Sequence, residues 1–83
     1  MRNERRLIVM ALADSHVAQT SKALLQAGAM VRAAIELRDR SQKPEEVSGL
    51  LLRCLDYQID CRRHLEDAVL LRDRVLSLWT EVE

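Results

Sequence analysis

The sequence predicts an all-α protein in which two long amphipathic helices form an antiparallel hairpin. Good helix formers fill both halves of the chain, and no segment alternates apolar and polar residues as a strand would. Hydrophobic residues make up 48% of the chain, yet Tyr57 and Trp79 are the only aromatic ones. A core of Leu, Val, Ile, Ala and Met suits helices packed on helices. The 83 residues are enough for a single domain, residues 1–83.

The first helix is expected over about residues 4–40. Asp14 or Ser15 could cap a new helix, so a break near residue 14 is the alternative to one continuous helix. Small residues dominate the expected packing surface, because many alanines surround its seam. That seam consists of Met10, Val17, Ser21, Leu24, Gly28, Val31 and Ile35.

A polar turn separates the two helices in the stretch RDRSQKPEE, residues 38–46. Pro44 disfavours a helical conformation at Lys43 but suits the first position of a new helix. Glu45 and Glu46 then fall in the first turn, where the helix dipole favours negative charge. We therefore expect a loop at 41–43 and a second helix over about 44–81. At 1.5 Å per residue, the hairpin would be about 50 Å long.

The second helix contains a heptad pattern, in which apolar residues recur at alternating steps of three and four. The predicted seam is Val47, Leu50, Cys54, Tyr57, Cys61, His64, Ala68, Leu71, Val75, Leu78 and Val82. A second apolar stripe lies beside it, formed by Leu51, Leu55, Leu65, Val69, Leu76 and Trp79. Since one neighbouring helix cannot cover both stripes, we expect a partner or a second copy to complete a structure like a four-helix bundle. The predicted interface residues are Leu51, Leu55, Tyr57, Leu65, Val69, Leu76 and Trp79.

Cys54, Cys61 and His64 lie close together in the sequence and on one face of the second helix. Zinc requires four ligands, commonly with closely spaced cysteine pairs, and this spacing lacks them. We therefore interpret the cysteines as small packing residues; a redox role or an intermolecular disulfide is the alternative. A polar residue in a seam often sets register, so His64 is a candidate register or pH-sensing residue, and Asp60 could pair with it. No metal or other cofactor is predicted.

Composition and motifs argue against several functions. Thirteen basic and thirteen acidic residues give no net charge, so neither nucleic acid nor an anionic membrane is an expected partner. The apolar run at 7–13 is too short to span a bilayer and the start too short for a signal peptide, which predicts a cytoplasmic protein with free thiols. There is no phosphate-binding loop and no interior cluster of cations like that of all-helical chorismate mutases. We expect a non-enzymatic protein without a small-molecule substrate.

The stretch KPEEVSGLLLRCLDYQIDCRRHLEDAVLL, in a chain of this size and layout, resembles the small co-chaperones of type III secretion needle subunits. The resemblance spans about residues 15–75 and contains no diagnostic motif. It implies that the hairpin clasps a larger helical-repeat chaperone, which keeps the needle subunit from polymerising. The predicted function is therefore a chaperone, co-chaperone or adaptor module that binds a helical partner through the second helix. The alternative is a self-associating four-helix homodimer acting as a regulatory, phage or plasmid accessory, or inhibitor protein.

Overall fold

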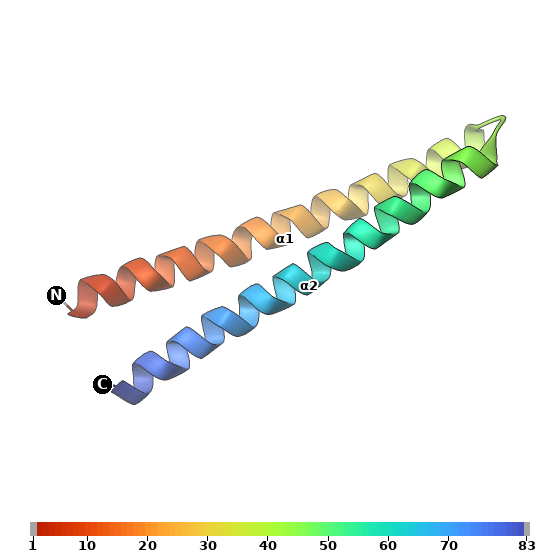
Figure 1. Ribbon diagram of the computed structural model, residues 1–83. Coiled ribbons are helices and arrows are strands. Elements are labelled where there is room, and N and C mark those ends of the chain that lie inside the picture. Colours follow the sequence, from red (N-terminus) through yellow and green to blue (C-terminus); the bar gives the residue numbers. More distant parts are fainter. Residues whose placement is uncertain (1, 83) are drawn as a thin grey trace.

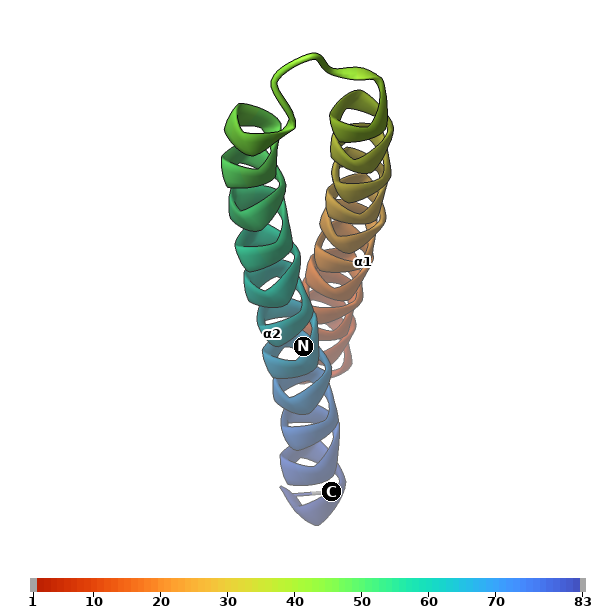
Figure 2. The ribbon, with the colours of Figure 1, turned by 90° about the vertical axis from the view of Figure 1, so that its right-hand side faces the viewer.

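The protein is an all-α hairpin of two helices that lie side by side along their length (Figures 1 and 2), as the sequence predicts. The structure, a computed structural model, describes the backbone of residues 2–82 and the side chains of residues 4–81. Helix α1 spans Arg2–Arg40 and helix α2 spans Pro44–Val82. The Cα atoms extend over 63 × 16 × 11 Å, and the start of α1 and the end of α2 lie at the end opposite the loop.

Helix α1 runs without interruption through Asp14 and Ser15, so the alternative of a break near residue 14 is wrong. The helix-favouring residues on both sides outweigh the capping tendency of the two short polar side chains. Within the same region, the Thr20 hydroxyl donates a hydrogen bond to the carbonyl oxygen of His16, at 2.9 Å. Its polar group is thus satisfied inside the helix.

The turn at 41–43 is closed by short local hydrogen bonds. The Ser41 amide donates to the Arg38 carbonyl at 3.4 Å, and the Lys43 amide donates to Ser41 Oγ at 3.0 Å. The Lys43 carbonyl then accepts the first bond of α2, from the amide of Glu46 at 3.2 Å. Pro44 follows as the first helical residue, where its missing N–H leaves no bond unmade. No residue described in this turn has a positive φ, so the reversal needs no glycine.

The helices meet along a continuous heptad seam. On α1 the buried or half-buried seam residues are Arg6, Met10, Ala13, Val17, Thr20, Leu24, Ala27, Val31, Ala34 and Arg38. On α2 they are Val47, Leu51, Cys54, Gln58, Cys61, Leu65, Ala68, Arg72, Val75 and Trp79. Near the loop, Val31 and Ala34 cluster with Leu51 and Cys54, which fixes the antiparallel register. A small residue then faces a larger one in many layers, as Ala34 faces Leu51.

On α2 one heptad row of the predicted seam is correct and the other is wrong, whereas on α1 the second predicted row is only partly buried. Cys54, Cys61 and Ala68 are buried on α2 as expected. The second packing row of α2, however, is the heptad row that starts at Leu51 and not the predicted row that starts at Leu50. Leu50, Tyr57, His64, Leu71 and Leu78 are exposed instead. On α1 the second row consists of Ala13, Thr20, Ala27 and Ala34; of the predicted residues beside it, Gly28 is buried, Ser21 is half-buried and Ile35 is exposed. Counting apolar residues misleads here because the true α2 row contains two polar ones, Gln58 and Arg72.

Both polar residues of the α2 row are half-buried, and side chains of this length can cover apolar neighbours with their aliphatic stems. Gln58 lies beside Gly28, where an added Cβ would stand 3.5 Å from its amide nitrogen. The Arg72 guanidinium is 3.5 Å from the carboxylate of Asp73. Within residues 2–82, neither helix combines the length and the apolar content needed to cross a membrane.

Candidate interaction surface

The exposed row of α2 and its neighbour on α1 form one long face, which we call the histidine face. At its centre His16, Ala23, Tyr57 and His64 line a single groove. Because residues seven apart keep the same side of a helix in a heptad seam, the face extends from this centre in both directions. Its members are Val9, His16, Ala23, Met30 and Leu37 of α1 and Leu50, Tyr57, His64, Leu71 and Leu78 of α2.

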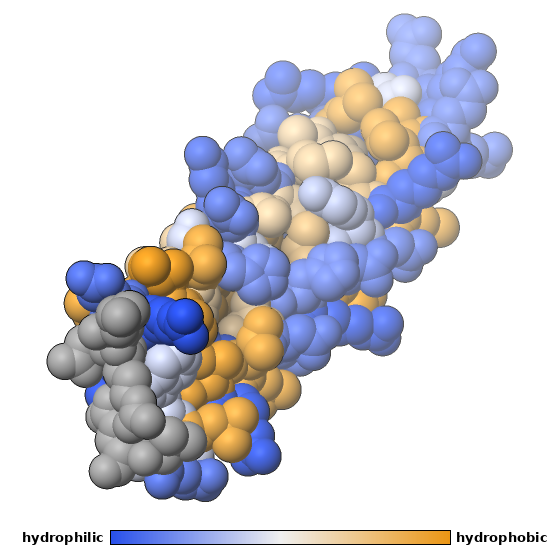
Figure 3. Space-filling view, turned by 60° about the vertical axis from the view of Figure 1, so that its left-hand side comes forward, coloured by the Kyte–Doolittle hydropathy of each residue, from blue (hydrophilic) through white to orange (hydrophobic). Residues whose placement is uncertain are grey.

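Eight of the ten residues of the histidine face are apolar or aromatic, and most are open to solvent. Met30, Leu37, Leu50, Tyr57, Leu71 and Leu78 each expose between 43% and 56% of their surface. Figure 3 shows hydrophobic side chains reaching the surface along the length of the hairpin between rows of hydrophilic residues. Contiguous apolar surface of this kind is typical of interaction sites.

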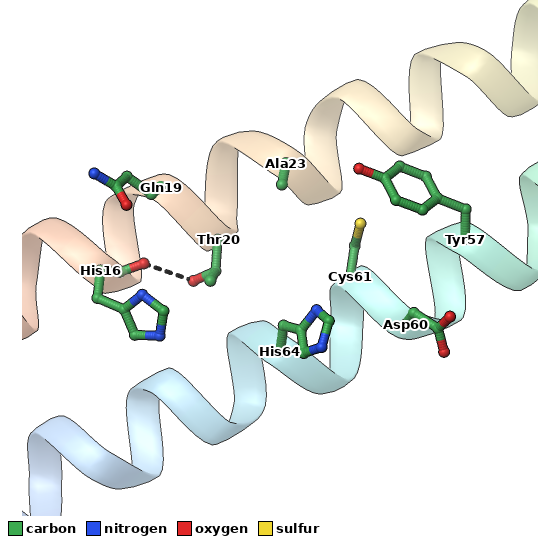
Figure 4. Close-up of a pocket in the computed structure, with 8 residues that line it drawn as sticks. All are labelled: His16, Gln19, Thr20, Ala23, Tyr57, Asp60, Cys61 and His64. Atoms are coloured by element: carbon green, nitrogen blue, oxygen red, sulfur yellow. Dashed lines mark hydrogen bonds between the residues drawn. The ribbon is translucent and has the colours of Figure 1, made fainter.

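The central groove is shallow, with a volume of about 360 Å³. Figure 4 shows one imidazole contributed by each helix, His16 from α1 and His64 from α2, with the Cys61 sulfur pointing toward α1. The carboxylate of Asp60 points away from His64, and the two side chains form no ion pair. His64 therefore lies on the flank of the seam, outside the packing layers, and without the predicted pairing to Asp60.

Tyr57 and Cys61 are neighbours in the groove, and their contact affects the pKa of Tyr57. Hydrogen bonding to Cys61, one turn along α2, raises the pKa of Tyr57, and the negative charge of the Cys61 thiolate would raise it further. That shift stabilises the neutral phenol and so works against a nucleophilic or basic role. Both cysteines are free and buried. Among the described residues, no three His, Cys, Asp or Glu side chains lie where they could hold a metal ion together.

A polar rim borders the histidine face on each helix. Gln19 and Asp60 line the outer edge of the central groove, which identifies the two heptad rows that form the rim. On α1 the rim consists of Arg5, Leu12, Gln19, Gln26, Ala33 and Arg40; on α2 it consists of Glu46, Arg53, Asp60, Asp67, Arg74 and Glu81. All of these residues are exposed, and the charged ones form no ion pair within the described part of the hairpin.

The structure separates the seven predicted interface residues. Tyr57 lies on the histidine face, whereas Leu51, Leu65 and Trp79 belong to the seam between the helices. The remaining three flank the seam on the opposite side of the hairpin: Leu55, Val69 and Leu76. Sequence analysis assigned several members of the histidine face to the internal seam. The signal that could have found them is the alanine row of α1, which admits Leu51 and Leu65 in preference to Leu50 and His64.

A second apolar patch lies on the opposite side of the hairpin, in the half nearer the loop. It consists of Leu25, Ile35, Leu52, Leu55 and Ile59, all exposed. Ala18 and Glu66 interrupt this patch one heptad beyond it, and the same side continues toward the ends of the helices with half-buried Val69 and exposed Leu76. The central groove lined by both helices lies on the histidine face and not in this patch.

No protein-family model matches the chain, and no curated protein or solved structure is significantly similar to it.

Proposed function

We propose that the hairpin is a cytoplasmic, non-enzymatic protein–protein interaction module that uses the histidine face to pack against helices. The observation that carries the proposal is the long, mainly apolar face, framed by a rim of exposed residues of which ten of twelve are polar or charged. An apolar centre with a polar rim is the usual anatomy of a protein interface. Pairs of side chains recurring every seven residues, such as Met30 and Leu37, match the spacing of another helix.

The thin internal core also supports this function. Among residues 4–81 no large side chain is fully buried, and Ala27 is the one buried hydrophobic residue there that is completely shielded from water. Small domains with little buried surface commonly gain stability from a partner. A helix or helix pair laid on the histidine face would provide the missing layer.

The co-chaperone role implied by the resemblance to type III secretion proteins is one form of this function. In that case the partner is a helical-repeat chaperone, and the hairpin expressed alone is poorly soluble until the partner is co-expressed. In the other form, the face is occupied by a second copy of the chain. The solution behaviour of the isolated protein separates the two forms.

The module itself is tested by quantitative affinity purification with a matched pair of variants, Leu71→Asp and Leu70→Asp. Both leucines lie on α2 and are mainly exposed, but only Leu71 belongs to the histidine face. We expect association, whether with another protein or with a differently tagged copy of the chain, to be lost with Leu71→Asp and retained with Leu70→Asp. Binding that survives Leu71→Asp would contradict the proposed function.

A further inference from the structure

We infer that the occupant of the histidine face is a second copy of this chain, packed face to face with both loops at the same end of a four-helix bundle. This inference rests on the proposed function and names its partner. Two properties carry it: the amount of surface that the hairpin leaves exposed, and the order of charges along the rim.

The hairpin exposes far more surface than a compact protein of its mass. Its accessible surface is 6710 Å², whereas a folded monomer of 9.5 kDa is expected to expose about 5,000 Å². The excess, about 1,700 Å² per chain, exceeds the roughly 800 Å² that each partner buries in a standard interface and falls in the range of obligate dimers. A second copy seated along the full 63 Å of the face would remove surface on this scale.

The rim charges select one of the two symmetric ways to stack two hairpins. With both loops at the same end, α1 of one copy lies on α2 of the other and follows the same antiparallel register as within the hairpin. Arg5 then lies opposite Glu81 and Arg40 lies opposite Glu46. The two α2 aspartates meet amides, since Asp67 lies opposite Gln19 and Asp60 opposite Gln26. The remaining two arginines face uncharged Leu12 and Ala33, so this arrangement contains no pair of like charges at the rim.

With the loops at opposite ends, α1 lies on α1 and α2 lies on α2, and the rim becomes repulsive. Every charged rim residue then faces a like charge of the second copy. The opposed pairs are Arg5 with Arg40, Glu46 with Glu81, Arg53 with Arg74, and Asp60 with Asp67. Like charges placed opposite one another disfavour association and thereby specify orientation. The charge order therefore favours loops at the same end.

The same arrangement places one small residue against a large one at the centre of the bundle. The short side chain of Ala23 faces His64 of the second copy, and the two His64 rings approach across the symmetry axis.

The orientation is tested by a distance between the two loops. Gln42 is exposed in the loop, so the variant Gln42→Cys carries a spin label without touching either face. The additional changes Cys54→Ala and Cys61→Ala remove the two native thiols, which would compete for the spin label. Alanine is compatible with their heptad row, because Ala68 already belongs to it. We expect a loop-to-loop distance of about 30 Å or less, set by packed helices about 10 Å apart plus the label arms. Loops at opposite ends would instead give a distance close to the 63 Å length of the hairpin, and that result would overturn the orientation.

Charge reversal gives an independent test of the same orientation. Glu46→Arg places two arginines opposite each other at each of two symmetric sites, so we expect the dimer dissociation constant to rise about tenfold. Adding Arg40→Glu should restore the original dissociation constant, because opposite charges then meet again at both sites. The single and the double variant carry the same unfavourable positive charge in the first turn of α2, so that charge cannot account for the difference between them. With loops at opposite ends, Glu46→Arg would meet Glu81 and tighten the dimer, the reverse of the expected result.

The outcomes separate this inference from the proposed function. A chain that stays monomeric, but binds another helical protein in a manner that depends on Leu71, overturns the second copy as the occupant and leaves the module intact. A monomeric chain with no association that depends on Leu71 overturns both. A dimer that withstands Leu71→Asp overturns the histidine face as its interface.

Discussion

The histidine face predicts that one substitution dissociates the protein while its neighbour in sequence does not. Leu71 and Leu70 are adjacent on α2 and are exposed to 56% and 67% in the isolated hairpin. Neither contributes much to the seam, so we expect Leu71→Asp and Leu70→Asp each to change the free energy of hairpin folding by no more than about 0.5 kcal/mol. In the bundle, however, only Leu71 becomes buried.

The magnitude follows from what the interface would cover. Burying the rest of the Leu71 side chain contributes about 1 kcal/mol, and an aspartate at the same place costs at least another 2 kcal/mol, because its carboxylate loses water without gaining a partner. Each dimer contains the change twice, so the total is about 6 kcal/mol. The dissociation constant should rise about 10⁴-fold. Leu70→Asp should leave the dissociation constant within about threefold of the original value.

Sedimentation velocity over a dilution series measures both dissociation constants, and circular dichroism shows whether each variant is still helical. A Leu71→Asp protein that remains helical and dimeric would refute the assignment of this face. Equal dissociation in the two variants would show that general surface charge, and not the position of Leu71, controls assembly.

Three further predictions concern the hairpin itself. Gly49→Ala should stabilise it by about 0.5–1 kcal/mol in thermal melts, because an added Cβ meets nothing within 4 Å and glycine weakens helices; an unchanged or lower Tm would contradict this. Leu51→Ala should destabilise it by about 2 kcal/mol in urea unfolding, because Leu51 is buried near the loop, and a cost below 0.5 kcal/mol would refute its place in the seam. Tyr57, the sole tyrosine, should titrate above pH 10 by absorbance at 295 nm and return toward 10 in Cys61→Ala. Since its folded pKa is raised, any stability that it contributes is present below pH 10 and is lost as the pH rises through the raised pKa; an unshifted midpoint would contradict the contact with Cys61.

The fold was predictable from sequence because its signals are local. Proline at position 44 followed by two glutamates marks the start of α2, and uninterrupted helix formers mark both helices. Their antiparallel packing follows from the short connection. The structure has these two helices, with bounds close to those expected.

The candidate surface was less predictable, because α2 has apolar residues on both sides of its row of small and β-branched ones. Two seams are then consistent with its pattern, and the choice depends on the shape of α1. The alanines of α1 leave room for Leu51 and Leu65, whereas Leu50 and His64 fall outside. Such a preference is a property of two helices together, so the periodicity of one helix cannot provide it.

The central claim is that the histidine face is covered in the assembled protein, and hydroxyl-radical footprinting tests it most directly. Met30 and Tyr57 are each 48% exposed in the hairpin and react readily with radicals, while Leu25 lies on the other side of the molecule and is 74% exposed. We expect oxidation of Met30 and Tyr57 to fall several-fold as the protein concentration rises through the dissociation constant, with Leu25 unchanged. Equal oxidation of Met30 and Tyr57 at all concentrations, in a protein that sedimentation shows to be assembled, would contradict the claim.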